Sequence, residues 1–214
     1  WFQPSSGHGA GVSSAPMLEQ RIQQHFIDSA DLKYQSAQIL SKPIADAVQA
    51  IMTCVTSGCK VLVCGNGASS ALAQHAAASF VGQFERERPE LAALALGTDA
   101  AALSAQAEQD YRQVFARQVR ALGLAGDVLL ALSADGQSPS VQAAVEAAHE
   151  RDMTVVALTG RSGGALGAGL RETDVHICVP HERVARIQEV HLLVLHCICD
   201  GVDAQLLGEQ ELPT

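Results

Sequence analysis

One pattern recurs along this chain and limits the folds that it can adopt. A short apolar run ends in a turn containing glycine, serine or threonine, and a helical stretch follows. Such runs, with strands predicted in each, occupy residues 60–64, 91–96, 127–132, 154–158 and 175–179. Buried strands that alternate with helices are typical of βα units in a parallel sheet. The sequence therefore predicts an α/β fold, a doubly wound five-stranded parallel sheet with helices on both faces.

The helical extension at the N-terminus and the chain ends complete the predicted organisation. Residues 17–40 carry apolar side chains at helical spacing, and a second helix is expected from Pro43 to near Gly58 with Ser41 as its cap. Residues 1–16 are rich in glycine and serine and are predicted to be a disordered leader or a cloning remnant. Residues 17–208 are predicted to form a single domain and residues 209–214 a tail, since no linker divides the chain.

Composition excludes several classes of function. Hydrophobic residues make up 48% of the chain, which excludes disorder as its main state. Fourteen Lys and Arg against 23 Asp and Glu give a net charge of −9, the wrong sign for direct nucleic-acid binding. The absence of a run of 18 apolar residues argues against a membrane span. Six cysteines without a CxxC pair predict reduced thiols, a cytoplasmic location and no cysteine zinc site.

Two polar loops follow neighbouring predicted strands. The first contains Asn66, Gly67 and Ser69, and the second contains Ser133, Gly136 and Ser138. A phosphate is held by several N–H and O–H donors at the positive end of a helix, which is what each loop offers. The alternative is that these are ordinary turn and cap residues. Neither loop is a dinucleotide fingerprint or a P-loop.

Two histidines interrupt apolar helices. Gln188 and His196 share one face of the last predicted helix, and they form either a satisfied core network or a site. His75 interrupts an alanine-rich helix after the first loop, where the alternative is an exposed helix surface.

Together these segments resemble the SIS (sugar isomerase) family, and more closely its phosphoheptose isomerase branch. Within that branch the chain is most similar to DiaA, a protein that associates with the replication initiator DnaA. The resemblance covers about residues 17–207. The likeness to the SIS family is carried by the following motifs: Cys64-Gly65-Asn66-Gly67 with Ser69, the loop 133–138, Leu158-Thr159-Gly160 and Arg186-Ile187-Gln188-Glu189-Val190-His191. The closer likeness to DiaA is carried by Gln74-His75 and the segments 84–89 and 117–123.

The resemblance implies a homotetramer with sites between subunits, and conversion of sedoheptulose 7-phosphate to a heptose phosphate. It implies a substrate contact at Asp99, phosphate binding by the loop 133–138, and proton transfer by a glutamate and a histidine. The histidine falls on His196 and the glutamate position is Ser79. Some members hold zinc, whose ligands would fall on His75, His196 and Gln188.

Two departures bear on activity. Ser79 is no base at neutral pH and removes the anionic zinc ligand, so we expect no cofactor and weak or no zinc binding. Asp135 is expected to bring a negative charge to the phosphate position. At about 4 Å and an effective dielectric of about 20 this costs about 4 kcal/mol per charge pair.

The departures favour a non-catalytic scaffold that resembles DiaA and binds DnaA as a homotetramer, with residual sugar-phosphate binding. The alternative is a phosphoheptose isomerase or another phosphosugar isomerase. In either case Gln188 and His196 are the expected catalytic residues if activity remains. Leu206 and Leu207 are predicted as a partner contact, with ordinary packing of the last helical turn as the alternative.

Overall fold

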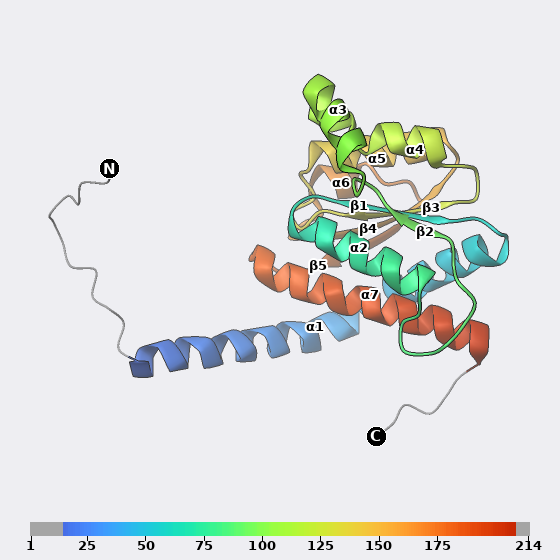
Figure 1. Cartoon of the computed structure of the whole chain (residues 1–214). Coiled ribbons are helices and arrows are strands. Elements are labelled where there is room, and N and C mark those ends of the chain that lie inside the picture. The colour runs from blue at the N-terminus through green and yellow to red at the C-terminus, as the bar shows by residue number, and fades with distance from the viewer. Residues whose placement is uncertain (1–14, 209–214) are drawn as a thin grey trace, which may run out of the picture.

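The computed structural model describes residues 15–208 (Figure 1). The predicted tail and residues 1–14 of the predicted leader lie outside this range, whereas Ala15 and Pro16 belong to the first helix. The helices are α1 (Ala15–Thr56), α2 (Ala68–Val81), α3 (Ala100–Asp110), the 3-10 turn η1 (Tyr111–Gln113), α4 (Ala116–Leu122), α5 (Pro139–Glu150), α6 (Gly164–Ala168) and α7 (Val184–Leu207).

The five predicted strands form one parallel sheet, as expected. They are β1 (Val61–Gly65), β2 (Ala93–Ala95), β3 (Val128–Leu132), β4 (Thr154–Gly160) and β5 (Val175–Val179). Their order is β2-β1-β3-β4-β5, and every neighbouring pair is parallel. β2 is shorter than the predicted run 91–96, but its register against β1 is regular, with Val61 opposite Ala93.

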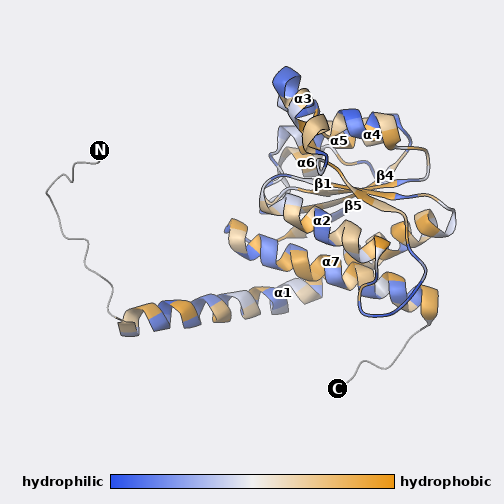
Figure 2. Cartoon of the chain, viewed as in Figure 1, coloured by the Kyte–Doolittle hydropathy of each residue, from blue (hydrophilic) through white to orange (hydrophobic). Residues whose placement is uncertain are grey.

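Both faces of the sheet are buried, because successive side chains of a strand point to opposite faces. Val61 and Val63 of β1 pack with α1, α2 and α7, whereas Leu62 and Cys64 pack with α4, α5 and α6. Figure 1 shows these two helical layers below and above the sheet, and Figure 2 shows the apolar interior between them. The prediction of helices on both faces is confirmed.

One helix replaces the two predicted at the N-terminus. α1 runs for 42 residues through Pro43, which lies inside it. Ser41 does not cap a second helix, because its hydroxyl donates back to the carbonyl of Ala37 within the same helix. Leu40 and Ala47 are buried on either side of Pro43, so packing against the body stabilises the helix across the proline.

α7 packs on α1 and α2 and is the central helix of its layer. In the described part of the chain it is the one helix long and apolar enough to cross a membrane, and ten of its residues are buried against the body. All six cysteines are free, although Cys197 is exposed and not a core thiol.

A buried ion pair ties α2 to α7. Arg88 Nε lies 2.5 Å from Asp203 Oδ1, and both side chains are almost fully buried. The same guanidinium donates to the carbonyls of Ser79 and Phe80, at 2.7 and 2.9 Å. Arg88 therefore closes the C-terminal end of α2 and holds it against α7.

His191 ties the middle of α7 to the end of β4. Its Nε2 lies 2.9 Å from the Thr159 carbonyl oxygen, and the side chain is fully buried. Burial lowers the pKa of His191 to about 4, while the hydrogen bond to Thr159 raises it in part. The imidazole is therefore neutral in the folded protein at neutral pH.

We predict an acid-sensitive contribution of His191 to stability. The pKa of a histidine in the unfolded chain is about 6.5, so between that pH and about pH 4 the unfolded state binds more protons than the native state. The native state is favoured above this window and is progressively destabilised as the pH falls through it, by about 2 kcal/mol between about pH 7.5 and 5. Urea unfolding at the two pH values measures the loss. His191→Gln is expected to reduce it, whereas His181→Gln is expected to leave it unchanged, and an equal loss in the His191 variant would contradict the assignment.

Candidate functional site at the carboxyl edge of the sheet

The loop after β1 turns directly into α2. Gly65 allows the close approach of the helix, because a Cβ there would lie 2.7 Å from the Cβ of Ser69. Gly67 has a φ of +58°, a left-handed conformation that suits glycine. Ser69, one of the predicted ligand residues, is buried, so its side chain is not exposed at the surface of the loop.

Asn66 joins this loop to the one after β3. Its Nδ2 donates to the hydroxyl oxygens of Ser138 and Ser140, both at 2.8 Å, and its Oδ1 accepts from the Tyr111 hydroxyl at 2.8 Å. β1 and β3 are neighbours from which the chain leaves to opposite faces, through α2 and α5. In open α/β sheets, ligands bind in the crevice between two neighbouring strands whose following helices lie on opposite faces of the sheet. The structure therefore brings the two predicted phosphate loops together.

The loop after β3 differs from expectation at Asp135. Its carboxylate accepts from the backbone N–H of Gln137 at 3.0 Å and lies 3.5 Å from the hydroxyl of Ser133. One oxygen of the carboxylate is thus turned onto its own loop, where it accepts hydrogen bonds from the loop itself. Gly136 has a φ of +67° and packs so closely that a Cβ would lie 1.9 Å from the Gly163 carbonyl oxygen. Gly136 shapes the loop and offers no side chain to a ligand.

Ser138 begins α5, with Pro139 in the first helical position as predicted. The hydroxyl of Ser138 makes no cap hydrogen bond and instead accepts from Nδ2 of Asn66. The first N–H groups of α5 have no intrahelical partner, which leaves donors for an anion at this end of the helix.

A pocket of about 310 Å³ opens beside Asn66. It is bounded by the loop after β1, the loop after β2 and the segment that joins α3 to α4, and Gly67, Ser70 and Tyr111 contribute to its wall. Its size is at the lower end of that of small-molecule sites. Asp99 does not line it, because its carboxylate caps α3 by accepting from the N–H groups of Ala101 and Ala102, both at 3.0 Å.

The two predicted histidines meet although they are far apart in sequence. His75 Nε2 of α2 lies 3.0 Å from His196 Nε2 of α7, and the rings form an edge-to-face pair. The ring of Phe84 stacks at a tilt on His196, with centroids 5.3 Å apart. Burial lowers the pKa of His196, a charge on His75 lowers it further, and Glu85 partly offsets both. His196 is therefore a neutral imidazole near pH 7, able to accept a proton.

The residues around this pair do not fit a closed zinc site. Ser79 Oγ donates to the His75 carbonyl at 2.9 Å, one turn back along α2. Gln188 is half-buried on α7, and within residues 15–208 no hydrogen bond links it to either imidazole. The same residues contain no group of three or more His, Cys, Asp and Glu side chains arranged for a metal. In this part of the chain, two imidazoles without a third ligand beside them fall short of the three or four protein ligands that zinc sites use.

The remaining predicted residues lie apart from these clusters. Leu206 and Leu207 are 37% and 39% exposed at the end of α7, next to Gly208, whose carbonyl accepts from Arg86. Sequence reasoning missed Ser140 and Tyr111. Ser140 follows Ser138 and Pro139 in the first turn of α5, and that position was the available signal.

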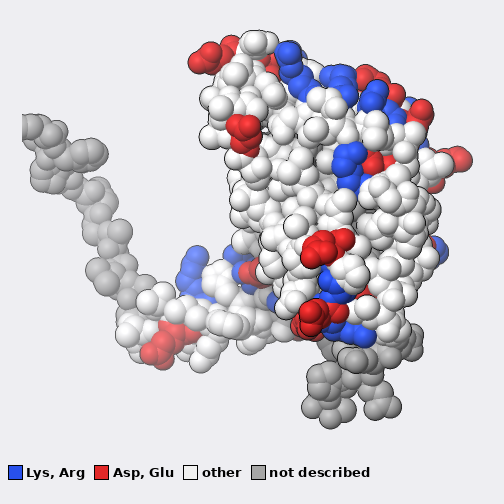
Figure 3. Space-filling model, turned by 45° about the vertical axis from the view of Figure 1, so that its right-hand side comes forward, with Lys and Arg blue, Asp and Glu red and all other residues white. Residues whose placement is uncertain are grey.

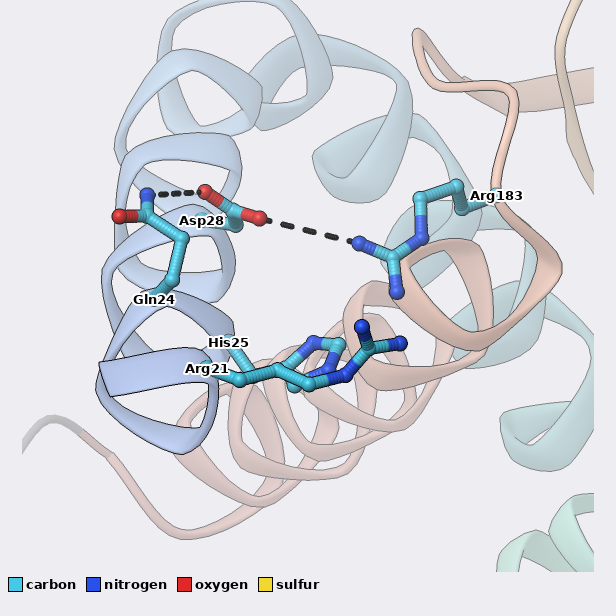
Figure 4. A pocket seen from close by; sticks show the side chains of 5 residues that line it. All are labelled: Arg21, Gln24, His25, Asp28 and Arg183. Atoms are coloured by element: carbon cyan, nitrogen blue, oxygen red, sulfur yellow. Dashed lines mark hydrogen bonds and ion pairs between the residues drawn. The ribbon is translucent and has the colours of Figure 1, made fainter. Parts of the chain in front are cut away.

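Basic and acidic side chains are intermixed along the upper edge in Figure 3. Among the exposed ion pairs, Arg112 pairs with Asp110 and Arg120 pairs with Glu150. A second pocket lies between α1 and the start of α7 (Figure 4) and is lined by Arg21, Gln24, His25, Asp28 and Arg183. Arg183 and Asp28 approach to 3.7 Å across it. None of the residues predicted from sequence lies in this pocket.

Comparison with known proteins gives one consistent family. The SIS domain matches residues 25–160. A phosphoheptose isomerase of Methylibium petroleiphilum is 66% identical over 197 residues, covering 92% of this chain and 98% of the relative. One of Azoarcus is 54% identical, covering 91% and 99%. The solved phosphoheptose isomerase GmhA from Neisseria gonorrhoeae superposes with a TM-score of 0.84 at 48% identity, covering 87% of this chain and 99% of that one.

These comparisons correct the predicted function. A non-catalytic scaffold that binds DnaA is wrong, because relatives up to 66% identical over nearly their full length are phosphoheptose isomerases. The predicted scaffold function was based on Ser79 as the loss of a catalytic carboxylate and on Asp135 as the loss of a phosphate-binding group. Asp135 faces its own loop, and the contact between His75 and His196 leaves proton-transfer groups in place beside Ser79.

We predict that Ser79 limits zinc affinity. Ser79→Glu adds a carboxylate one turn from His75, and we expect zinc affinity to rise at least about tenfold because the ligand set gains an anion. Isothermal titration with zinc measures the change. Ser79→Gln, of equal size and without charge, is the control and is expected to bind zinc as the wild type does. Tight binding by the wild type would contradict the prediction.

Proposed function

We propose that this chain, which belongs to the SIS domain family and to its phosphoheptose isomerase branch, interconverts the ketose and aldose forms of a phosphorylated heptose. The substrate is sedoheptulose 7-phosphate and the product a D-glycero-manno-heptose 7-phosphate. The observation that carries the proposal is the imidazole pair, with His75 and His196 Nε2 atoms 3.0 Å apart.

The chemistry requires a base and an acid near two adjacent carbons. In the ketose-to-aldose direction a proton leaves C1, an enediol forms, and a proton is returned to C2 while another moves from O1 to O2. His196 serves as the base, because its lowered pKa keeps it neutral. When His196 takes up a proton, His75 can accept a hydrogen bond from the protonated ring through the Nε2 contact. The pair replaces the carboxylate that the family resemblance places at Ser79.

The phosphate binds at the other cluster. The half-buried Ser138 hydroxyl and the N-terminus of α5 lie at the crevice between β1 and β3, where Asn66 holds the two loops together and the buried Ser140 supports it from within. Among the described residues no hydrogen bond or ion pair joins this cluster to the histidine pair. The family resemblance implies sites between subunits, and we infer that an oligomer brings the two clusters to one substrate. We place the enzyme in the cytoplasm, where its six free thiols would stay reduced.

The proposal predicts turnover of sedoheptulose 7-phosphate by the purified protein without added metal. In deuterium oxide the aldose product is expected to carry deuterium at C2, because the enediol exchanges its proton with solvent. Proton and phosphorus NMR measure both. His196→Asn should lower kcat by about 10²- to 10³-fold, and His181→Asn is the matched control.

The pH profile provides a second readout of the same prediction. Activity is lost when the base is protonated, so the acid limb of kcat/KM is expected below about pH 6.5, the ordinary histidine value. Neither product nor deuterium exchange at high protein concentration would overturn the proposed function.

We infer a homotetramer that uses the projecting part of α1. Figure 1 shows this part extending past the α/β body, and Figure 2 shows apolar residues along it. Leu18, Ile22, Phe26 and Ile27 are between 47% and 75% exposed there. A row of large exposed apolar side chains on one helix is typical of a protein interface, and a symmetric oligomer would cover it.

Light scattering after size exclusion tests the assembly. Four copies of the 22.4 kDa chain should give about 90 kDa. A double variant, Ile22→Lys with Phe26→Lys, is expected to dissociate because it places charges in the apolar contact. Leu124→Lys, at a 58% exposed position away from α1, is the control. A monomeric wild type would contradict the inference.

A further inference from the structure

The hydrogen bonds of Asn66 use both ends of its amide. Its two N–H groups donate to Ser138 and Ser140, and its oxygen accepts from Tyr111. Tyr111 lies 45 positions farther along the chain, at the junction of α3 and η1, and Tyr111 and Asn66 both line the same pocket. Neither the fold nor the proposed proton transfer requires this hydroxyl.

We propose that Tyr111 is a positioning residue that orients Asn66 so that the Ser138 hydroxyl keeps its proton for the substrate phosphate. The inference rests on the proposed function, because it concerns the phosphate end of the same site.

The argument follows the direction of each hydrogen bond. A serine hydroxyl has one proton to donate and two lone pairs that accept. Ser138 and Ser140 both accept from Asn66, and their hydroxyl oxygens lie 3.4 Å apart, so the buried Ser140 can donate its proton to Ser138. The half-buried Ser138 then keeps its own proton for a phosphate oxygen, which is only an acceptor. With the amide reversed, its oxygen would take the Ser138 proton and the phosphate would lose that donor. The Tyr111 phenol, the stronger donor in this set, occupies that oxygen and favours the observed orientation.

The surroundings of Tyr111 indicate that its hydroxyl has this role and not a packing role. The side chain is 49% exposed, and α3, which leads to it, has no buried residue. In contrast, Ser140 is almost fully buried and depends on a fixed partner for its hydroxyl. Loss of the phenol oxygen should therefore change the orientation of Asn66 without unfolding the protein.

The test is Tyr111→Phe in the full-length protein, with inorganic phosphate as the probe. Phosphorus NMR titration is expected to show phosphate affinity about five- to tenfold weaker, the scale of one or two hydrogen bonds. KM for sedoheptulose 7-phosphate should rise by a similar factor while kcat changes less than about twofold, because the histidine pair is untouched. Tyr34→Phe, at the 81% exposed tyrosine on α1, is the matched control and should change neither.

A second variant separates action through Asn66 from a direct effect. In an Asn66→Ala background, Tyr111→Phe should have no further effect on phosphate affinity. An unchanged affinity in the single variant, a full effect that persists without Asn66, or a wild type that binds no phosphate would each overturn the inference. A wild type that binds phosphate but turns over no sugar would overturn the proposed isomerase activity alone, and the titrations would still decide the role of Tyr111.

Discussion

Burial of the sheet on both faces is the constraint on which the rest of this structure depends. Alternate residues of each strand pack into separate cores, one with α1, α2 and α7 and the other with α4, α5 and α6. The chain leaves β1 toward the first core through α2 and leaves β3 toward the second core through α5. At β1 and β3 this divergence opens the crevice in which Asn66 and the start of α5 lie. The position of the site thus follows from the way the cores are filled.

The same layering places the histidine pair. α2 and α7 belong to one layer, and the Arg88–Asp203 pair fixes the end of one helix against the other. His75 and His196 meet within that contact, beside Phe84. A neutral imidazole there keeps a proton acceptor in the family fold even though position 79 carries a serine. A serine at position 79 therefore does not by itself remove every proton acceptor from this layer.

Most strands and helices could be predicted from the sequence, because apolar runs, glycine turns and Pro139 determine the conformation of the few residues around them. The continuity of α1 could not be predicted, because the burial of Leu40 and Ala47 outweighs the tendency of Pro43 to start a new helix. The paired loops were predicted as sites, but the hydrogen bond from the Gln137 backbone N–H that orients the Asp135 carboxylate could not be predicted from residue type alone. Tyr111 joins the site through a contact 45 positions from Asn66, beyond the reach of any local pattern.

The ion pair between Arg88 and Asp203 has a consequence for how such a sequence can change. Its two members lie 115 positions apart and are both excluded from solvent. Removal of either one leaves an uncompensated charge in the interior, which costs about 3–5 kcal/mol. Replacement of both by apolar side chains of similar volume is tolerated far better. A lineage that abandons the pair must therefore change both codons almost together or pass through a poorly folded ancestor, which makes these two positions a record of shared descent independent of the catalytic groups.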